Sequence, residues 1–180
     1  MNSPKYHFIT HWLVDATASE VYEILKQNQR LPEWWSAVYL DVKILKDGDS
    51  DGIGKLVELY TKGWLPYTLR WKYRVLDVQK PHRIQIEAIG DFIGNGLWTL
   101  ENTESGQCKM TYDWQIEAKK PLLKKLSWLM KPLFSFNHLW AMQKGEESLK
   151  LEILRQKGIL NVPSPPKPTF PHNLLNNKIL

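Results

Sequence analysis

His138 is the side chain of this sequence whose type and position best suit acid–base chemistry. It lies in the segment FNHLWAMQKGEESL, residues 136–149, one helical turn before Met142 and two turns before Gly145. The glycine would leave space beside the helix, and an imidazole that titrates near neutrality could transfer a proton to a bound molecule. The alternative is a neutral histidine that is hydrogen-bonded to a neighbour. His138 is therefore the best candidate for a catalytic residue, without a recognised catalytic motif around it.

The remaining reactive side chains form no recognisable metal-binding or catalytic pattern. The five histidines are dispersed, and His7 and His11 are too far apart along a predicted strand for easy chelation. Cys108 is the single cysteine, which excludes an internal disulfide and suits a reducing, cytoplasmic location. No P-loop or dinucleotide-binding fingerprint is present, and Asp91 is expected in a turn rather than as an acid. We therefore expect no metal and no cofactor.

Positive charge is concentrated between residues 119 and 157, which hold nine Lys or Arg and three Glu. The excess is lysine on a predicted helix and no nucleic-acid-binding motif is visible, so we expect no nucleic-acid partner. The segment KKPLLKKLSWLMKP, residues 119–132, could contact anionic lipid. Its membrane or partner surface would consist of Lys124, Lys125, Trp128 and Lys131. The alternative is a solvated helix edge whose apolar side packs on the protein or in a homodimer.

The chain of 180 residues is most simply one domain, residues 1–157, followed by an extension, residues 158–180. The extension holds five of the eleven prolines, so it is expected to be extended. Its Leu and Ile residues could pack back over the final helix, beside Trp140. Neither a signal-peptide-like segment nor an uncharged run long enough to span a bilayer is visible, so we expect a soluble or at most peripheral protein.

Apolar alternation and turn residues predict seven strands and two short helices before a long final helix. Thr17 and Glu20 have the spacing of a capping box, which predicts a helix from residue 17 to about residue 27. A short second helix or turn is expected at 31–35, where Pro32 lies near the start. The predicted strands are 6–14, 38–46, 54–62, 68–79, 83–91, 95–102 and 107–117.

Two of these strands alternate clearly between apolar and polar residues. In 107–117, one face carries Cys108, Met110, Tyr112, Trp114 and Ile116. In 68–75, one face carries Leu69, Trp71, Tyr73 and Val75. This pattern predicts an antiparallel sheet with one solvated face and one covered face.

The final helix is the only long element available to cover that face. On a helical wheel one stripe runs from Phe134 through His138 and Met142 to Ile153, whereas apolar residues between Leu122 and Trp140 fall on roughly the opposite side. Because proline disrupts a helix interior, we expect a kink or break near Pro132 that lets the two halves face differently.

Several segments resemble the SRPBCC (START-like) superfamily, in particular its polyketide cyclase/dehydrase-like members. They are WW at 34–35, ELYTKGWLPYTLRW at 58–71, GDFIGNGLW at 90–98, TYDW at 111–114 and NHLWAMQKGEESL at 137–149. The resemblance covers about residues 5–157. It implies an α+β helix-grip fold, in which a curved seven-stranded antiparallel sheet wraps around a long C-terminal helix, with two short helices after the first strand. It also implies an apolar cavity between the sheet and that helix.

On such a fold, the covered strand faces and the His138 side of the helix would line the cavity. The expected ligand-binding residues are Trp71, Tyr73, Met110, Tyr112, Trp114, His138 and Met142. Large aromatic side chains with a few polar tips suit an apolar ligand such as a lipid, an isoprenoid or a polyketide, although these residues could also simply fill the core.

Our leading hypothesis is therefore a protein that binds a hydrophobic small molecule in this cavity. One alternative is a cyclase- or dehydratase-like enzyme that uses general acid–base chemistry in the same cavity, with His138 or a tyrosine as proton donor. The other alternative is a peripheral membrane or protein-interaction module that acts through residues 119–140.

Overall fold

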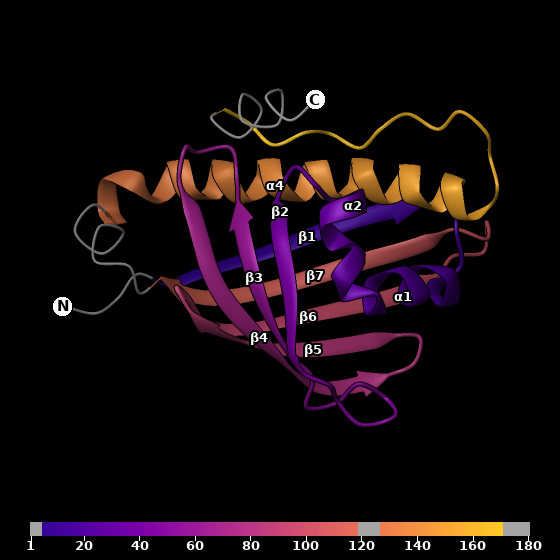
Figure 1. Cartoon of the computed structure of the whole chain (residues 1–180), viewed down its shortest axis with the longest axis horizontal. Helices are drawn as coiled ribbons and strands as arrows, with labels where there is room; N and C mark the ends of the chain where they lie inside the picture. The colour runs from indigo at the N-terminus through magenta and orange to yellow at the C-terminus, as the bar shows by residue number, and fades with distance from the viewer. Residues whose placement is uncertain (1–4, 119–126, 171–180) are drawn as a thin grey trace.

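One antiparallel sheet of seven strands organises the chain, in the order β1-β7-β6-β5-β4-β3-β2 (Figure 1). The computed structural model describes residues 5–118 and 127–170, without the side chains of Phe92, Ala118 and residues 127–131. The strand bounds are β1 Lys5–Val14, β2 Tyr39–Lys46, β3 Leu56–Lys62, β4 Thr68–Gln79, β5 Arg83–Gly90, β6 Phe92–Asn102 and β7 Cys108–Ala118. All seven predicted strands are confirmed, with small differences in their ends.

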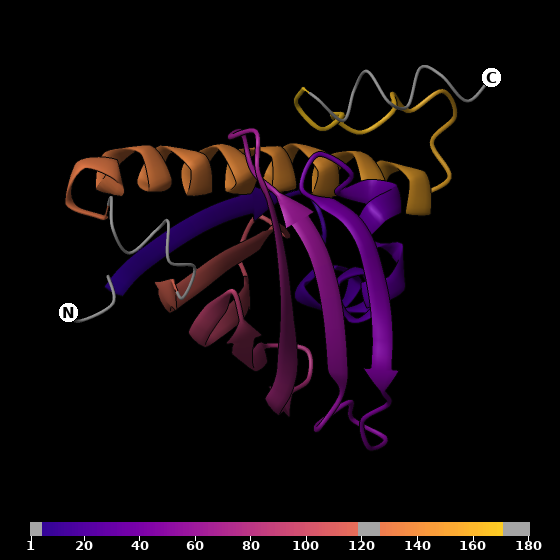
Figure 2. The ribbon, with the colours of Figure 1, turned by 60° about the vertical axis from the view of Figure 1, so that its left-hand side comes forward.

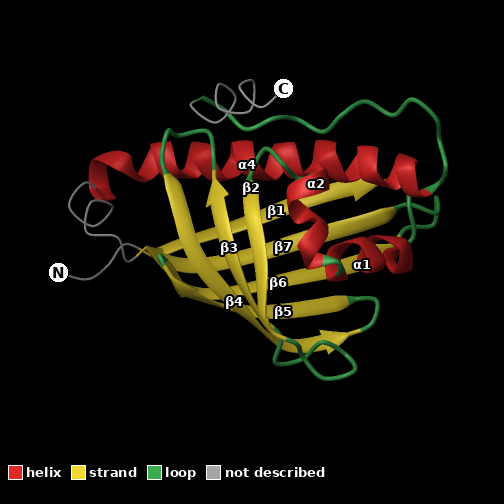
Figure 3. Ribbon diagram, in the orientation of Figure 1, coloured by secondary structure: helices red, strands yellow, loops and turns green. Residues whose placement is uncertain are grey.

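Two short helices and a 3-10 turn connect β1 to β2: α1 Ala18–Lys26, η1 Asn28–Arg30 and α2 Leu31–Trp34. The predicted capping box is present at the start of α1. The Thr17 side chain accepts a hydrogen bond from the Glu20 backbone N–H (3.2 Å), and the Glu20 carboxylate accepts one from the Thr17 N–H (2.7 Å). Both helices lie together at one end of the sheet (Figure 3).

The long helix α4, Ser127–Gln156, crosses the sheet, which curves beneath it (Figure 2). Met142, Leu149 and Ile153 are buried, so the predicted sheet-facing stripe is confirmed. An ion pair between the Arg30 guanidinium and the buried Glu152 carboxylate (2.9 Å) links the later part of α4 to η1. These elements confirm the expected helix-grip architecture. In the described residues, no helix combines the length and the apolar character needed to cross a membrane.

Of the kink or break expected near Pro132, the break is wrong, because α4 continues through this residue as one helix. Pro132 is exposed, and α4 continues here without the i→i−4 hydrogen bond that a proline cannot donate. The consequence is that the second apolar stripe stays partly in solvent. Phe136 and Leu139 expose 48% and 59% of their surface.

The segment after α4, residues 158–170, runs back along this helix on the side away from the sheet (Figure 1). The expected packing of its aliphatic residues is wrong for Ile159 and Leu160, which are exposed. Polar contacts hold the segment instead. The buried Lys62 ammonium donates to the Thr169 carbonyl (3.0 Å), the Thr169 hydroxyl (2.5 Å) and the Phe170 carbonyl (3.2 Å). The Ser36 hydroxyl donates to the Pro166 carbonyl (3.1 Å).

A candidate ligand cavity between the sheet and the last helix

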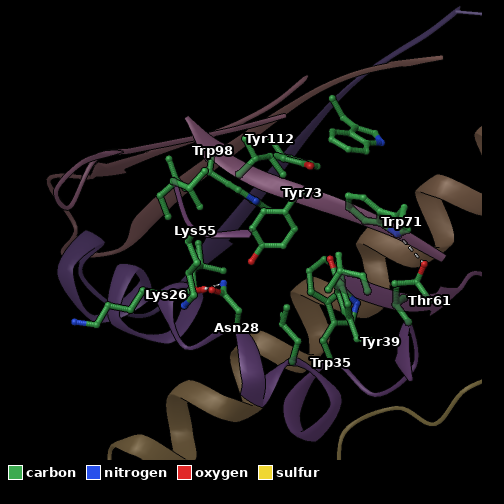
Figure 4. Close-up of a pocket in the computed structure, with 18 of the residues that line it drawn as sticks. Lys26, Asn28, Trp35, Tyr39, Lys55, Thr61, Trp71, Tyr73, Trp98 and Tyr112 are labelled. Atoms are coloured by element: carbon green, nitrogen blue, oxygen red, sulfur yellow. Dashed lines mark hydrogen bonds between the residues drawn. The ribbon is translucent and has the colours of Figure 1, made fainter. Parts of the chain in front are cut away.

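A cavity of about 490 Å³ lies between the inner face of the sheet and α4. This volume falls within the usual range for small-molecule sites. In Figure 4, Tyr73, Trp98 and Tyr112 on the sheet face Trp35 and Tyr39 across the cavity. The walls thus combine residues from the sheet with residues from the α2 region, which are far apart in the sequence.

Six of the seven predicted ligand-binding residues line this cavity: Trp71, Tyr73, Tyr112, Trp114, His138 and Met142. Met110 does not, although it shares a face of β7 with Tyr112. It is fully buried opposite Trp12 in the sheet register, and Trp12 in turn lies against Gly145 of α4. At this point helix and sheet are in direct contact, so Met110 belongs to the solid core.

Three tyrosine hydroxyls provide polar groups within the mostly apolar wall: those of Tyr39, Tyr73 and Tyr112. Burial raises the pKa of each phenol above its ordinary value, and the neighbouring phenols raise the pKa of Tyr73 and Tyr112 further. All three are therefore protonated at neutral pH and can donate a hydrogen bond. Among the described residues, none of these hydroxyls has a hydrogen-bond partner.

Stacked aromatic rings build the wall of the sheet. Tyr112 stacks on Trp98 at 4.3 Å and on Trp114 at 5.5 Å between ring centroids. The neighbouring Trp71 donates its indole N–H to the Thr61 hydroxyl (3.1 Å; Figure 4). Gly96 makes this stack possible, because a Cβ there would lie 2.6 Å from the Tyr112 hydroxyl oxygen. Gly96 of the GDFIGNGLW segment is therefore explained by the close approach of aromatic rings.

Trp35, Tyr39 and Trp98 are lining residues that the sequence reasoning did not select as ligand-binding. The paired tryptophans offered a partial signal: Trp34 is completely buried, whereas Trp35 lines the cavity and donates its indole N–H to the Ala141 carbonyl (3.3 Å). Tyr39 carried no such signal, because it is the first residue of an edge strand and only the fold brings it opposite Tyr73.

One end of the cavity, beside α1 and the β2–β3 connection, is lined by charged residues. Lys80 pairs with Asp51 at 2.6 Å, and Lys26 pairs with Glu23 at 2.6 Å. Burial lowers the pKa of Lys55, and the nearby Asp47 carboxylate partly offsets this effect. This end is a polar mouth, in contrast to the aromatic interior.

His138 lies at the opposite end, where its ring stacks on Phe8 at 4.2 Å between centroids. Burial lowers its pKa to about 4, and its Nε2 atom is buried without a hydrogen-bond partner in the part of the chain that is described. The expectation of an imidazole that titrates near neutrality is therefore wrong. Desolvation disfavours the imidazolium, so His138 is neutral at pH 7.

The other candidate residues lie elsewhere. Lys124 and Lys125 of the predicted basic surface lie outside the described residues, and Trp128 and Lys131 belong to α4 without described side chains. Asp91 accepts a hydrogen bond from the Arg70 backbone N–H (3.0 Å) at the bend between β5 and β6, as expected for a turn residue. Within residues 5–118 and 127–170, no group of His, Cys, Asp or Glu side chains is arranged to hold a metal ion.

A family model described as "Polyketide cyclase / dehydrase and lipid transport" matches residues 9–150 of the chain. The match spans the sheet and most of α4. No curated protein matches the chain at a significant level.

Solved structures with the same fold share little sequence with this chain. The Zhui aromatase/cyclase from Streptomyces sp. R1128 is 14% identical, with a TM-score of 0.66 over 86% of this chain and 96% of that chain. TTHA0849 from Thermus thermophilus is 16% identical, with a TM-score of 0.64 over 85% and 99% of the two chains. A norcoclaurine synthase from Thalictrum flavum is 16% identical, with a TM-score of 0.58 over 87% and 99%. At these identities the likeness extends to the fold alone.

Proposed function

Because the chain belongs to the polyketide cyclase/dehydrase and lipid transport family of the SRPBCC superfamily, we propose that it binds an apolar small molecule that carries at least one oxygen atom. The binding site is the cavity between the sheet and α4. The aromatic wall supplies apolar contact area, and the phenol hydroxyls orient the ligand by donating hydrogen bonds to its oxygen.

The observation that carries this proposal is the set of three protonated hydroxyls without partners among the described residues. A ligand that displaces water from a cavity hydroxyl without pairing with it leaves that hydroxyl unsatisfied, which costs free energy, whereas a ligand oxygen that accepts its hydrogen bond avoids this cost. A purely hydrocarbon ligand would leave Tyr39, Tyr73 and Tyr112 unpaired. The cavity therefore favours an oxygen-bearing ligand over a hydrocarbon of the same shape.

Matched fluorescent probes test the proposal. We expect 4-ethylstilbene to bind, and 4-methoxystilbene, in which an acceptor oxygen replaces one methylene of the ethyl group, to bind more tightly by roughly five- to ten-fold, as one recovered hydrogen bond predicts. The triple variant Tyr39→Phe/Tyr73→Phe/Tyr112→Phe, which removes all three hydroxyls, should bind both compounds equally. Tyr60→Phe is the matched control, since Tyr60 does not line the cavity. Absence of binding by both stilbenes, or a preference that survives in the triple variant, would overturn the proposal. Native mass spectrometry of the purified protein would identify any small molecule that copurifies.

A cyclase- or dehydratase-like activity receives less support from the site. Two enzymes share the fold, the Zhui aromatase/cyclase and the norcoclaurine synthase. However, a histidine whose pKa is about 4 does not supply a proton at neutral pH, and its imidazole is a weak base. The remaining proton donors, the phenols, have raised pKa values and serve better as hydrogen-bond donors than as acids.

A further inference from the structure

Lys55 brings a positive charge to the inner face of the sheet, at the polar mouth of the cavity. It directly precedes β3, in which the alternate residues Val57, Leu59 and Thr61 are buried on that face. The Lys55 carbonyl accepts a hydrogen bond from the Val75 N–H (3.0 Å), which extends the pairing of β3 with β4 by one residue. Lys55 therefore continues the inward-facing row of β3, and it lines the cavity.

Three other lysines line the cavity, and each of them has a partner: Lys26, Lys62 and Lys80. Lys26 and Lys80 form ion pairs with carboxylates, each at 2.6 Å, and the Lys62 ammonium donates to oxygens of residues 169 and 170. The Lys55 ammonium has neither an ion pair nor a hydrogen bond within the described residues. Of these four lysines, it is therefore the one whose charge is available to a ligand.

The sheet register places Lys55 near the central phenols. Val57, two residues after Lys55, is opposite Tyr73, and Lys55 itself is opposite Val75. Lys55 and Tyr73 are thus diagonal neighbours on one face of the sheet, and such neighbours lie about 7–8 Å apart, within reach of long side chains. A molecule that accepts a hydrogen bond from the Tyr73 hydroxyl can therefore also extend a group to the Lys55 ammonium.

The unpaired ammonium favours an anionic group on the ligand over a neutral one. A ligand that fills the mouth removes water from the half-buried Lys55, whose pKa is already lowered by burial. A neutral ligand would leave this charge uncompensated, whereas a carboxylate compensates it through a charge-assisted hydrogen bond. The exposed Asp47 carboxylate also lines the mouth and would repel a dianion such as a phosphate ester more strongly than a monoanion. The balance of charges therefore favours a carboxylate.

We infer that Lys55 recognises a carboxylate, and that the ligand is an apolar carboxylic acid whose carboxylate lies at the mouth and whose apolar body lies in the aromatic interior. This inference rests on the proposed function, because it concerns the same cavity and an oxygen-bearing apolar ligand. It adds the charge of the ligand and the direction in which the ligand lies.

Two stilbenes of nearly equal shape test the inference: stilbene-4-carboxylate, which is ionised at pH 7, and stilbene-4-carboxamide, which is neutral. We expect the wild-type protein to bind the carboxylate about ten-fold more tightly, as a hydrogen bond between charged groups predicts. Lys55→Met, which removes the charge and keeps an apolar side chain, should abolish or reverse this preference and largely keep the affinity for the carboxamide. Lys26→Met is the matched control and should keep the preference, because Lys26 is paired with Glu23 and extends away from the aromatic residues in Figure 4.

The outcomes separate this inference from the proposed function. Equal binding of the two compounds by the wild type, a preference that survives in Lys55→Met, or a preference that Lys26→Met also abolishes would overturn the inference. The proposed function would still stand in each of these cases, since the ethyl and methoxy compounds test it separately. If none of the four stilbenes binds, both are overturned. Lys55→Gln is a second neutral variant that gives the same comparison if the methionine variant does not fold.

Discussion

At the scale of single residues, the environment of a side chain decides its chemistry more than its type does. His138 illustrates this, because imidazole is the usual proton carrier near neutral pH, yet burial against Phe8 lowers its pKa to about 4. The tyrosines illustrate the opposite consequence. Burial makes their phenols weaker acids but leaves them available as hydrogen-bond donors. The same desolvation therefore favours recognition over proton transfer in this cavity.

The shifted pKa of His138 makes the stability of the protein depend on pH. In the unfolded chain the imidazole binds a proton below about pH 6.5, whereas in the folded protein it does so only below about pH 4. The folded state is thus penalised as the pH falls through this window, by roughly 3 kcal/mol when fully developed. We expect His138→Gln to lose less stability than the wild type between pH 7 and pH 4.

Urea denaturation at a series of pH values measures this difference, and the comparison uses the slopes of the two profiles rather than their absolute values. Glutamine cannot titrate, so any cost of the substitution at neutral pH cancels. Two parallel profiles would show that the His138 imidazole is protonated equally in the folded and unfolded states.

At the scale of elements, the contact between α4 and the sheet depends on a position without a side chain. A Cβ at Gly145 would lie 2.3 Å from Trp35 Cζ2 and 2.7 Å from Trp12 Cη2. Both rings are buried, and the Trp35 indole is hydrogen-bonded to α4 through Ala141. Trp12 does not line the cavity, so its ring has no cavity space into which it could move, and the hydrogen bond to α4 holds the Trp35 ring in place. The glycine therefore sets the distance between helix and sheet, and through it the depth of the cavity.

We expect Gly145→Ala to destabilise the protein, although alanine normally stabilises a helix interior by about 1 kcal/mol relative to glycine. Here the clash with two indole rings outweighs that gain, and overpacking of this kind costs typically about 1–3 kcal/mol. Urea denaturation provides the measurement. Gln143→Ala, an exposed position on the same helix, is the control and should change stability little. A Gly145→Ala protein as stable as the wild type would contradict the described packing.

At the scale of the whole molecule, the proline-rich extension is bound to the domain through a buried lysine. Lys62 is 1% exposed, and its ammonium finds its partners about a hundred residues later in the chain, at Thr169 and Phe170. Burial lowers its pKa. The prediction that residues 1–157 form the domain and residues 158–180 an extension remains untested, but these contacts make the two parts energetically dependent on each other.

A double-mutant cycle tests this dependence. We expect Thr169→Val to lower the free energy of unfolding by roughly 1.5–3 kcal/mol, because it removes an acceptor from a buried charge. In the Lys62→Met background, where no charge needs that acceptor, the same substitution should cost clearly less. Urea denaturation of the four proteins gives the coupling. Equal costs in both backgrounds would mean that the Lys62 contact does not hold the extension.

The second apolar stripe of α4, which includes Phe136, is partly exposed to solvent. Phe136 lies edge-on against Trp64 at 5.4 Å, and both are about half exposed. Contact of the lysine-rich segment with an anionic membrane, or of this stripe with a second copy of the chain, stays a prediction, since the lysines at positions 124 and 125 lie outside the described residues.

The sequence by itself determined the strands, the first helices and the sheet-facing stripe of α4. These features depend on local rules: the period-two alternation in β4 and β7, the capping box at Thr17, and the helical spacing from His138 to Leu149. Six of the seven residues predicted to bind a ligand do line the cavity. They could be predicted because alternation assigns each side chain to one face of the sheet, and the helix-grip resemblance indicates which face is covered.

Only the tertiary structure decided what each of those faces contacts. It placed Met110 in the solid core and brought Tyr39 opposite Tyr73. It also carried α4 through Pro132 without a break. The physical reason is that local patterns determine only the direction of a side chain. The depth of its burial, the partners of its polar atoms and hence its pKa depend on segments far away in the sequence that pack against it.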